Sequence, residues 1–398
     1  MLVMKKWWIW LIAAVVAAAG GWYAWHAATR PLSLGAPNIS VPAQTTRAAT
    51  LAWPAEGRAA VGFAAGGGAS CRSFGDAAAQ PTASLAKVIT ALVVLGKYPL
   101  NNGDGPLITM TNDDVARLFD TQANNGSYVP IVAGEQLSER QMLQALMLAS
   151  ANNLADSLAI WAFGSLDDYR TAAESWLAQD GLLETTIGAD ASGFDPGTKS
   201  TASDLCKLAL LVAKNQTLAD IMGTIDVSDF PVVGQLHNTN RLLDTDGIFA
   251  GKTGFTDEAG HGVLILAQVE MNGTAQTVAV AMLGQGSYAA AFDGAQILLD
   301  SVGANLTARV IVRQGQKVGQ ITNVWPSGTD LIAGNDLTAT TWVDQPADVE
   351  ITDYQVGGQQ LPAGAPVGNI SADGQAVNVT TKNNIVRPSL LWRLGHGF

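Results

Sequence analysis

The chain has 398 residues, of which 48% are apolar and 14% charged, and its formal net charge is −12. This composition excludes a disordered chain, and the length suffices for one large domain with a smaller companion. The negative charge argues against a nucleic-acid partner, because such a surface would repel phosphates.

The first 30 residues have the pattern of a membrane-targeting segment. Lys5 and Lys6 precede an uncharged run from Trp7 to Trp25, which as a helix would be roughly 28 Å long, close to the bilayer's hydrocarbon thickness. Aromatic residues mark both ends of the run, as in paired interfacial belts. We predict an uncleaved anchor over residues 1–30, with the rest of the chain on the extracytoplasmic side of the membrane. A signal peptide cleaved near Ala17–Ala19 is the alternative, and it would make the protein secreted.

Residues 31–50 contain three prolines among small polar residues and are predicted to be a linker. Arg58–Ala65 and Ala69–Phe74 have the composition of strands and are separated by a run of glycines. These two segments are expected to pair as neighbours in a sheet.

A helix is predicted from about Ser84 to Leu95, and its apolar residues lie on all sides, which is typical of a helix buried inside a domain. The helix begins with Ser84-Leu-Ala-Lys87. One turn places the Lys87 amine on the same face as the Ser84 hydroxyl. Burial disfavours the ammonium form of lysine, so Lys87 can take the proton of a Ser84 nucleophile.

Ser138 and Gln141 have the spacing of a capping box and open an apolar helix. That helix ends at Ser150-Ala-Asn152, before a second helix from about Leu154 to Phe163. A chain that turns between the two helices can direct both Ser150 and Asn152 into a cleft.

Residues 192–197 are rich in loop-forming types, and Thr201 with Asp204 indicates the start of a further helix. The third short motif, Lys252-Thr-Gly254, follows. It precedes two strand-like runs that flank Asn272-Gly273, a strong signal for a hairpin.

A helix from about Tyr288 to Leu299 closes this part of the chain. Strands at both ends of residues 51–304, around a helical middle, fit one antiparallel sheet with a helical subdomain. The sequence pattern changes over residues 305–398, where short runs of β-branched residues alternate with turn residues. This segment is predicted to form a small all-β domain without catalytic groups. Its tail, residues 385–398, is interpreted as a packed segment, with a membrane-surface segment as the alternative.

Cys71 and Cys206 are the only cysteines. Two buried free thiols are the favoured interpretation and a disulfide is the alternative, since spacing does not decide between them. The sequence has no H-E-x-x-H pattern or Cys/His cluster, so neither a metal nor another cofactor is expected. His261 is interpreted as structural or solvent-facing rather than as part of a site.

The three motifs, in the order S-x-x-K, S-x-N and K-T-G, resemble those of penicillin-recognising serine enzymes. The similarity to low-molecular-mass D-alanyl-D-alanine carboxypeptidases, the penicillin-binding proteins of peptidase family S11, extends to the flanking segments Pro81–Thr90, Ser200–Asp204, Asn238–Leu243 and Gly251–Thr256. The resemblance implies an α+β fold, with a DD-peptidase-like antiparallel sheet flanked by helices, a helical subdomain and a C-terminal β domain.

The resemblance also implies roles for the motif residues. Ser84 would be the nucleophile, Lys87 its base and Ser150 a proton shuttle to the departing amine. Burial and the positive charge of Lys252 would both lower the pKa of Lys87. For the substrate, the resemblance implies a binding site made of Asn152 for an amide, Lys252 and Thr253 for the terminal carboxylate, Gly254 for close approach of the backbone, and the N–H groups of Ser84 and Phe255 for the oxyanion.

The implied activity is removal of the terminal D-alanine of peptidoglycan stem peptides through an acyl-enzyme on Ser84, with β-lactams as covalent inhibitors. The alternatives are a D,D-endopeptidase or a serine β-lactamase of the same fold, or a non-catalytic penicillin-binding sensor. Ala151 stands where class A β-lactamases carry an aspartate, and no segment matches their deacylating glutamate. Both differences favour a peptidase over a β-lactamase.

Overall fold

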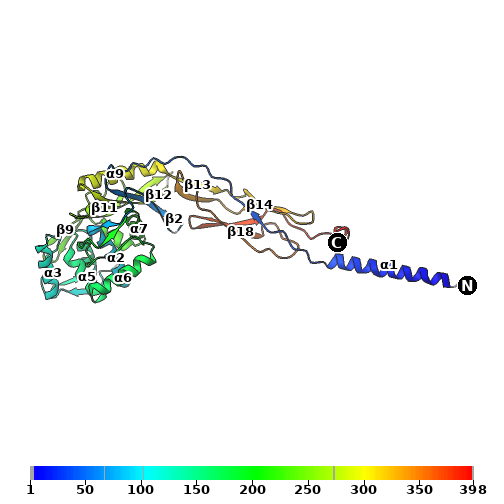
Figure 1. Cartoon of the computed structure of the whole chain (residues 1–398), viewed down its shortest axis with the longest axis horizontal. Coiled ribbons are helices and arrows are strands. Elements are labelled where there is room, and N and C mark those ends of the chain that lie inside the picture. The colour runs from blue at the N-terminus through cyan, green and yellow to red at the C-terminus, as the bar shows by residue number, and fades with distance from the viewer. Residues whose placement is uncertain (1–3, 67, 102, 272–273, 397–398) are drawn as a thin grey trace. The chain divides into compact units, whose positions relative to one another are not determined.

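The computed structural model describes residues 4–396 apart from residues 67, 102, 272 and 273. The chain forms two compact units, one of Ala48–Thr307 and one of Met1–Arg47 together with Ala308–Phe398. Figure 1 shows the elements of both units. The domain boundaries expected from the sequence stay a prediction. All three short motifs lie in the larger unit.

The larger unit is built on a five-stranded sheet in the order β10-β11-β12-β2-β3, with every neighbouring pair antiparallel. Its strands are β2 (Arg58–Ala65), β3 (Gly68–Phe74), β10 (Ile248–Thr256), β11 (Gly260–Met271) and β12 (Thr274–Gln285). The predicted strand pair and the two predicted hairpin strands are present, while the Asn272-Gly273 turn lies outside the described residues. Together with the helices, this sheet confirms the α+β fold.

The helices of the larger unit pack partly on this sheet and partly on one another (Figure 1). They are the 3-10 helix η1 (Ala83–Leu85) and the α-helices α2 (Ala86–Lys97), α3 (Asn112–Ala123), α4 (Glu139–Met147), α5 (Asn152–Phe163), α6 (Leu166–Gln179), α7 (Ala202–Ala213), α8 (Gln216–Gly223) and α9 (Tyr288–Asn305). Short strands pair as β4 (Gln80–Pro81) with β7 (Lys199–Ser200), β5 (Leu107–Thr109) with β6 (Gln136–Ser138), and β8 (Asp226–Phe230) with β9 (Gly234–His237).

Two predicted helix starts are confirmed by their caps. The Ser138 hydroxyl accepts a hydrogen bond from the N–H of Gln141, whose side chain accepts one from the N–H of Ser138. At the start of α7, the Thr201 hydroxyl accepts a hydrogen bond from the N–H of Asp204. These bonds satisfy amide groups that have no partner within the helix.

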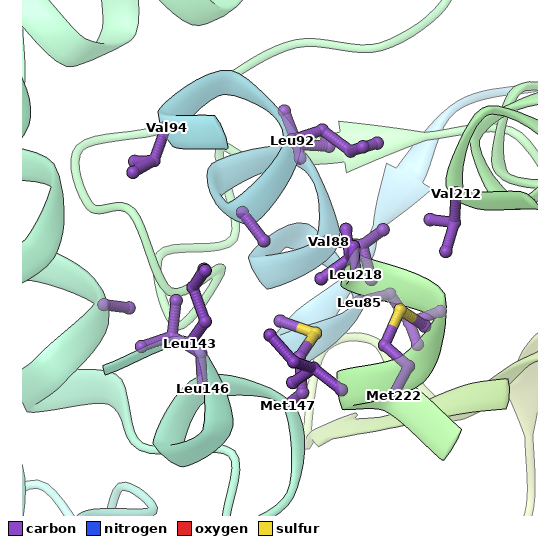
Figure 2. Close-up of a cluster of buried hydrophobic side chains, with 14 of the residues drawn as sticks. Leu85, Val88, Leu92, Val94, Leu143, Leu146, Met147, Val212, Leu218 and Met222 are labelled. Atoms are coloured by element: carbon purple, nitrogen blue, oxygen red, sulfur yellow. The ribbon is translucent and has the colours of Figure 1, made fainter. Parts of the chain in front are cut away.

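Helix α2 is buried on all sides, as predicted: every side chain from Ala86 to Leu95 is buried. Figure 2 shows the apolar cluster around it, formed by Leu85, Val88, Leu92, Val94, Leu143, Leu146, Met147, Val212, Leu218 and Met222. These residues come from η1, α2, α4, α7 and α8. Lys87, on this helix, is therefore held at 0% exposure.

The start of the predicted helix differs from expectation. Ser84 lies in η1, and the α-helix begins only at Ala86. Ala83 has a positive φ of 47°, so the chain enters the helix through a sharp turn. The tighter 3-10 turn still leaves Ser84 and Lys87 on one face, because residues three apart align in both helix types.

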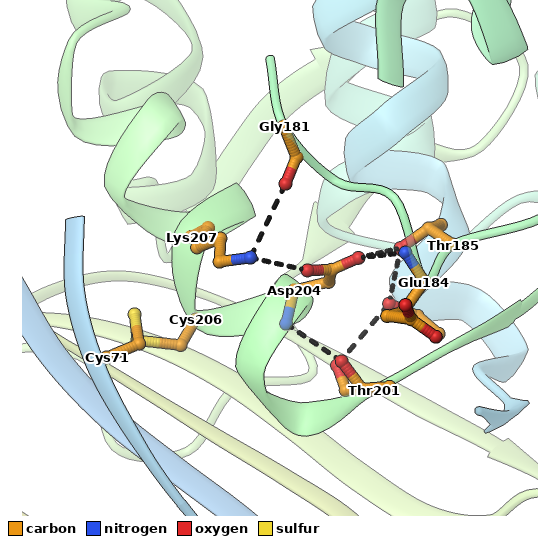
Figure 3. Close-up of polar contacts among 9 residues, drawn as sticks. Cys71, Gly181, Glu184, Thr185, Thr201, Asp204, Cys206 and Lys207 are labelled. Atoms are coloured by element: carbon orange, nitrogen blue, oxygen red, sulfur yellow. Dashed lines mark hydrogen bonds and ion pairs between the residues drawn. A yellow bond between two sulfur atoms is a disulfide. The ribbon is translucent and has the colours of Figure 1, made fainter. Parts of the chain in front are cut away.

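A disulfide joins Cys71 of β3 to Cys206 of α7, so the favoured interpretation of two free thiols is wrong (Figure 3). Sequence spacing could not show that β3 and α7 pack together. Gly62 of β2 leaves room for the bond, since a Cβ there would lie 2.6 Å from the Cys71 sulfur and 2.7 Å from the Cys206 sulfur. The bridge closes a chain separation of 135 residues, which by loop entropy is worth about 5 kcal/mol.

Polar contacts of Asp204 fix the start of the same helix (Figure 3). One carboxylate oxygen accepts hydrogen bonds from the N–H of Glu184 and the hydroxyl of Thr185, and the other pairs with Lys207 at 2.8 Å. These bonds tie α7 to the loop that precedes β7.

The smaller unit contains a six-stranded sheet in the order β1-β14-β15-β19-β18-β17 and a separate β13-β16 pair. Its strands are β1 (Asn38–Ile39), β13 (Leu306–Val312), β14 (Lys317–Ile321), β15 (Thr329–Ala333), β16 (Leu337–Trp342), β17 (Glu350–Asp353), β18 (Pro366–Ala372) and β19 (Gln375–Thr381). β1 belongs to the segment expected as a linker, and Leu34 of that segment is buried in the core of this unit. Residues 34–39 thus contribute to the β-rich unit.

Helices α1 (Met4–Thr29) and α10 (Leu390–Gly395) also belong to the smaller unit. Within the described chain, the stretch Trp7–Thr29 is long and apolar enough to cross a membrane. The tail packs on the end of α1: the Tyr23 hydroxyl donates to the carbonyl of Leu394 at 2.5 Å. Arg393, 9% exposed, donates to the carbonyls of Ala27 and Arg30. The tail is therefore a packed segment, as favoured from the sequence.

Candidate active site

Three segments of the larger unit converge on one cavity of about 170 Å³. Turn η1 brings Ser84, the α4–α5 connection brings Ser150 and Asn152, and β10 brings the K-T-G motif. The residues that line the cavity are Ser84, Asn125, Gly126, Ser127, Ser150, Asn152, Phe194, Thr239, Thr253, Gly254, Phe255, Thr256 and Tyr288. Of the predicted site residues, only Lys87 and Lys252 are absent from this lining, and both are fully buried.

The Lys87 amine has three close neighbours. Its nitrogen lies 2.8 Å from the Ser84 hydroxyl oxygen, 2.6 Å from the side-chain oxygen of Asn152 and 2.9 Å from the carbonyl oxygen of Ser192. The oxygens of Asn152 and Ser192 can only accept hydrogen bonds. In a neutral amine these two acceptors take both N–H groups, so its lone pair is directed at the Ser84 hydroxyl.

The electrostatics of Lys87 favour this neutral form near pH 7. Burial lowers the pKa of Lys87 from 10.5 to about 7, while the charges of Asp190 and Asp156 act in the opposite direction. When both amines are charged, Lys87 and Lys252 repel each other, and this interaction favours the neutral form of either one.

Lys252 is the second buried amine. Its nitrogen donates to the Ser150 hydroxyl at 3.0 Å and to the carbonyl of Thr253 at 2.9 Å. Burial, and after it the charge of Lys87, holds the pKa of Lys252 well below its usual value. Two ammonium groups so close together repel each other, so the pair favours one charge at a time.

Ser150 occupies a strained position between α4 and α5, with a positive φ of 59°. Such backbone persists only where its surroundings hold it. The N–H of Ala151 donates to Ala145 O and that of Asn152 to Ser127 O, which fixes the chain on both sides of the turn. Because of this turn, the Ser150 hydroxyl accepts a hydrogen bond from Lys252 and the Asn152 side-chain oxygen accepts one from Lys87. The two residues of the motif therefore contact different amines.

A loop after α6, which the sequence marked only as irregular, completes the site. Ser192 supplies the carbonyl that binds Lys87. The carboxylate of Asp190 accepts hydrogen bonds from the N–H groups of Ser192, Gly193 and Asp195, and Asp156 accepts one from Ala191. Burial, with the charge of Asp190, raises the pKa of Asp156 to about 6. In the sequence, this loop is marked only by an Asp shortly before a Ser-Gly pair, a pattern too frequent to indicate a functional site.

Two glycines let backbone segments meet at the turn that carries Ser84. A Cβ at Gly193, where φ is +75°, would lie 2.1 Å from the carbonyl oxygen of Ala83. A Cβ at Gly254 would lie 3.1 Å from the backbone nitrogen of Ser84. Gly254 thus lies close to the turn that carries Ser84, and the expected approach of a substrate backbone to Gly254 stays a prediction. The short distance from Gly254 to that turn also brings the backbone of Phe255 next to that of Ser84.

Strand β10 is an edge strand, paired with β11 through Thr253↔Val263 and its neighbours. An edge strand presents unpaired N–H and C=O groups that can bind an extended peptide. Next to the cavity at Ser84 lies a second cavity of about 690 Å³. Four residues line both cavities: Asn125, Phe194, Phe255 and Thr256.

An aromatic group borders the cavity. The ring of His261 stacks on Phe255 with centroids 4.2 Å apart and meets the Tyr288 ring edge-on at 4.6 Å. His261 does not line the cavity, in agreement with the structural interpretation. The sequence assigned no role to Tyr288 or Thr239, although both line the cavity; Thr239 lies in the segment Asn238–Leu243 that shares the family resemblance, while Tyr288 stands in an ordinary sequence context.

Comparison with known proteins gives one family for this chain. The family model of D-alanyl-D-alanine carboxypeptidase, Peptidase S11, matches residues 75–285. A D-alanyl-D-alanine endopeptidase of Pseudomonas aeruginosa is 31% identical over 46% of this chain and 57% of its own length. The D-alanyl-D-alanine carboxypeptidase DacF of Bacillus subtilis is 26% identical over 45% of this chain and 46% of its own. The chain thus spans about half the length of these curated relatives.

Solved structures extend the likeness over more of the chain. Penicillin binding protein 5 from Haemophilus influenzae superposes with a TM-score of 0.61 and 18% identity, covering 86% of this chain and 99% of that one. A peptidoglycan synthesis regulatory factor (PBP3) from Streptococcus pneumoniae superposes with a TM-score of 0.61 and 20% identity, covering 84% of this chain and 100% of that one. At these identities the likeness shows a shared fold.

Proposed function

Because the chain belongs to the D-alanyl-D-alanine carboxypeptidase family, peptidase family S11, we propose that it removes the terminal D-alanine of peptidoglycan stem peptides through an acyl-enzyme on Ser84. The observation that carries this proposal is the hydrogen bonding of Lys87. Asn152 and Ser192 take its two N–H groups and leave its lone pair for the Ser84 hydroxyl. A serine with a positioned, neutral base is an activated nucleophile.

In acylation, Ser84 Oγ attacks the carbonyl carbon of the penultimate residue while Lys87 takes the hydroxyl proton. The backbone N–H groups of Ser84 and Phe255 stabilise the oxyanion. The departing nitrogen receives a proton from Ser150, and Lys252 replaces that proton through its 3.0 Å hydrogen bond. An incoming carboxylate favours the ammonium form of Lys252, so the proton is available there. One proton leaves Ser84 and one arrives on the amine.

Deacylation runs through the same groups in reverse, with water in place of the amine. Water attacks the ester carbon and gives its proton to Ser150, which passes one to the now neutral Lys252 amine. The Lys87 ammonium returns its proton to Ser84 Oγ as the ester bond breaks. This scheme restores both lysines to their starting states and needs no glutamate base.

The substrate would lie as an extended chain along the free edge of β10. The Asn152 side-chain oxygen is occupied by Lys87, so its NH₂ group is what remains to bind a substrate carbonyl. Lys252 and Thr253 would receive the terminal carboxylate. The cavity of about 690 Å³ beyond Phe255 offers room for the acyl side of the peptide.

A D,D-endopeptidase is the second candidate, favoured by the 31% identical relative of that name. Cross-linked muropeptide dimers and monomeric pentapeptides separate the two activities. Release of D-alanine from the monomer supports the carboxypeptidase, and cleavage of the dimer alone supports the endopeptidase.

The test of the main proposal is intact-protein mass spectrometry with diacetyl-Lys-D-Ala-D-Ala and with benzylpenicillin. We expect D-alanine release from the peptide and a long-lived penicilloyl adduct on Ser84. Ser84→Ala should abolish both, while Ser175→Ala, on the exposed face of α6, should change neither. Rapid penicillin turnover would indicate a β-lactamase instead, and an adduct without any peptide cleavage would indicate a penicillin sensor.

We further propose that α1 remains on the mature protein and anchors it with the larger unit outside the cytoplasm. Support comes from the helix itself: the apolar stretch Trp7–Thr29 is continuous across Ala17–Ala19 and is long enough to cross a membrane, which exceeds the apolar segment of a typical signal peptide. The mass of the protein extracted from membranes tests this. A full-length mass supports the anchor, and loss of residues 1–19 would indicate a cleaved signal peptide.

A further inference from the structure

The cavity of about 690 Å³ next to the one at Ser84 is lined by three segments of the larger unit. They are the end of β10 with the turn after it, residues 255–258; the loop after α6, at residues 189–190 and 194–196; and residues 124–125 after α3. Because Phe194 and Phe255 line both cavities, a ligand that reacts at Ser84 can extend from one into the other.

The acyl side of a substrate leads into this cavity. In the proposed acylation the attacked carbonyl lies at the N–H of Phe255 and the terminal carboxylate at Thr253, so the substrate runs antiparallel to β10. The residue before the attacked one then lies beside position 257, because two residues beyond Phe255 correspond to about 7 Å along an extended chain. Its side chain is the first on the acyl side that can enter the cavity.

The charges in this cavity have one sign. Four of the lining residues are acidic, namely Asp190, Asp195, Asp257 and Glu258, and no lysine, arginine or histidine is among the described residues that line it. A cleft lined by charges of one sign concentrates their field and attracts groups of the opposite sign. The cavity therefore favours a cation on the substrate.

Two of these carboxylates are available for direct contact with a ligand. Asp190 accepts hydrogen bonds from three N–H groups of its own loop, and Asp195 accepts one from Gly197. Asp257 and Glu258 are instead exposed on the turn between β10 and β11. Asp190 and Asp195 thus add to the field, while Asp257 and Glu258 can pair with an incoming ammonium group.

Exposed aromatic rings give the cavity an apolar part as well. Phe194 is 42% and Phe255 45% exposed, and the Phe255 ring is held by stacking on His261 with centroids 4.2 Å apart. Methylene groups laid on these rings remove apolar surface from water. An aliphatic chain that ends in an ammonium group fits both parts, with its methylenes on the rings and its charged end at the carboxylates.

We propose that Asp257 and Glu258 are specificity-determining residues that, with Phe255, form a subsite for a cationic, lysine-like side chain one residue before the attacked carbonyl. This inference rests on the proposed function and narrows its substrate class to peptides with an unsubstituted side-chain amine at that position. A peptide whose amine is acylated keeps the contact with the rings and loses the contact with the carboxylates.

The test compares kcat/KM for Nα-acetyl-Lys-D-Ala-D-Ala, which has a free side-chain amine, with that for diacetyl-Lys-D-Ala-D-Ala. We expect the wild-type protein to prefer the free amine about fivefold at low salt. In the double variant Asp257→Asn, Glu258→Gln this preference should fall below twofold. The turn should keep its backbone, because it is held by the hydrogen bond from the N–H of Ala259 to the Thr256 hydroxyl.

The matched control is the double variant Glu174→Gln, Asp180→Asn, which removes two exposed carboxylates of the same unit outside the cavity. It should keep the wild-type preference. No preference in the wild-type protein, or the same preference in the Asp257, Glu258 variant, would overturn the subsite.

A parallel comparison uses acylation of Ser84 by a penicillin with an aminohexanoyl side chain and by its N-acetyl derivative, followed by intact mass. It tests the subsite even if the wild-type protein releases no D-alanine, the result that would reject the proposed function alone. Faster acylation by the free amine that is lost in Asp257→Asn, Glu258→Gln supports the subsite. Equal rates for the two penicillins in the wild-type protein, or equal losses for both in the variant, would overturn it.

Discussion

The amine nitrogen of Lys87 lies 2.8 Å from the hydroxyl oxygen of Ser84, one helical turn away, with both residues held against an apolar core. The other two neighbours of this amine are acceptors only, so the arrangement presents a lone pair to the hydroxyl. Burial lowers the pKa of Lys87 to about 7, so the neutral amine that our proposal requires is accessible near neutral pH.

Replacing Lys87 by arginine should remove most of the acylation activity. A guanidinium stays charged at any pH a protein tolerates and cannot accept the Ser84 proton. The second-order rate of penicillin acylation should fall about a thousandfold, within the range typical of a lost general base. Lys97→Arg, at the end of the same helix, is the control, since Lys97 donates to the carbonyl of Ala162 and lies over the rings of Tyr98 and Phe163. Similar rates in both variants would contradict the role of Lys87.

Asp190 should be a positioning residue whose loss alters the pH profile. Its carboxylate holds the loop that presents Ser192 O, and its charge raises the pKa of Lys87. In Asp190→Asn we expect the acylation rate to fall about tenfold and the midpoint of its pH dependence to move to lower pH. A slower rate with an unchanged midpoint would show that Asp190 acts only by holding the loop and would contradict an effect of its charge on the pKa of Lys87.

Gly193→Ala should destabilise the larger unit by about 2–4 kcal/mol, because the new methyl group meets the Ala83 carbonyl and φ there is positive. Gly134→Ala separates the two causes: Gly134 also has a positive φ, of +85°, but nothing lies within 4 Å of its Cβ position. We expect about 1 kcal/mol for that variant in urea unfolding. Equal effects at both glycines would contradict the close packing of the loop on the nucleophile turn.

The Cys71–Cys206 disulfide should stabilise the fold without taking part in catalysis. The double variant Cys71→Ser, Cys206→Ser should lose about 5 kcal/mol of unfolding free energy, since the cross-link restricts the unfolded chain. Peptide hydrolysis under native conditions should be kept. Thiol titration of the denatured wild-type protein is the check: two reactive thiols before reduction would show that the bond does not form.

Much of the site could be predicted because its signals are local. The spacing of Ser84 and Lys87 and the capping box at Ser138 depend on neighbours within one helical turn. Apolar residues on every side of the helix also predicted that Lys87 would be buried, as it is.

What the sequence missed depends on contacts between distant segments. The disulfide needs β3 and α7 to pack together, and the Ser192 carbonyl reaches Lys87 only through the fold of a loop 105 residues away. Thr239 and Tyr288 come from separate parts of the chain and line the same cavity as Thr253. The 3-10 start of the nucleophile helix likewise follows from the positive φ of Ala83, which no propensity favours.

We propose above all that a neutral Lys87 activates Ser84. The most direct measurement is the rate of Ser84 acylation by benzylpenicillin, followed by intact mass between pH 5 and 10. Below its pKa the amine is protonated and cannot act as a base, so the rate should be low in acid, rise through a midpoint near 7 and then level off. A rate that keeps rising to pH 10, as an ordinary lysine would require, or an adduct on a residue other than Ser84, would contradict the account.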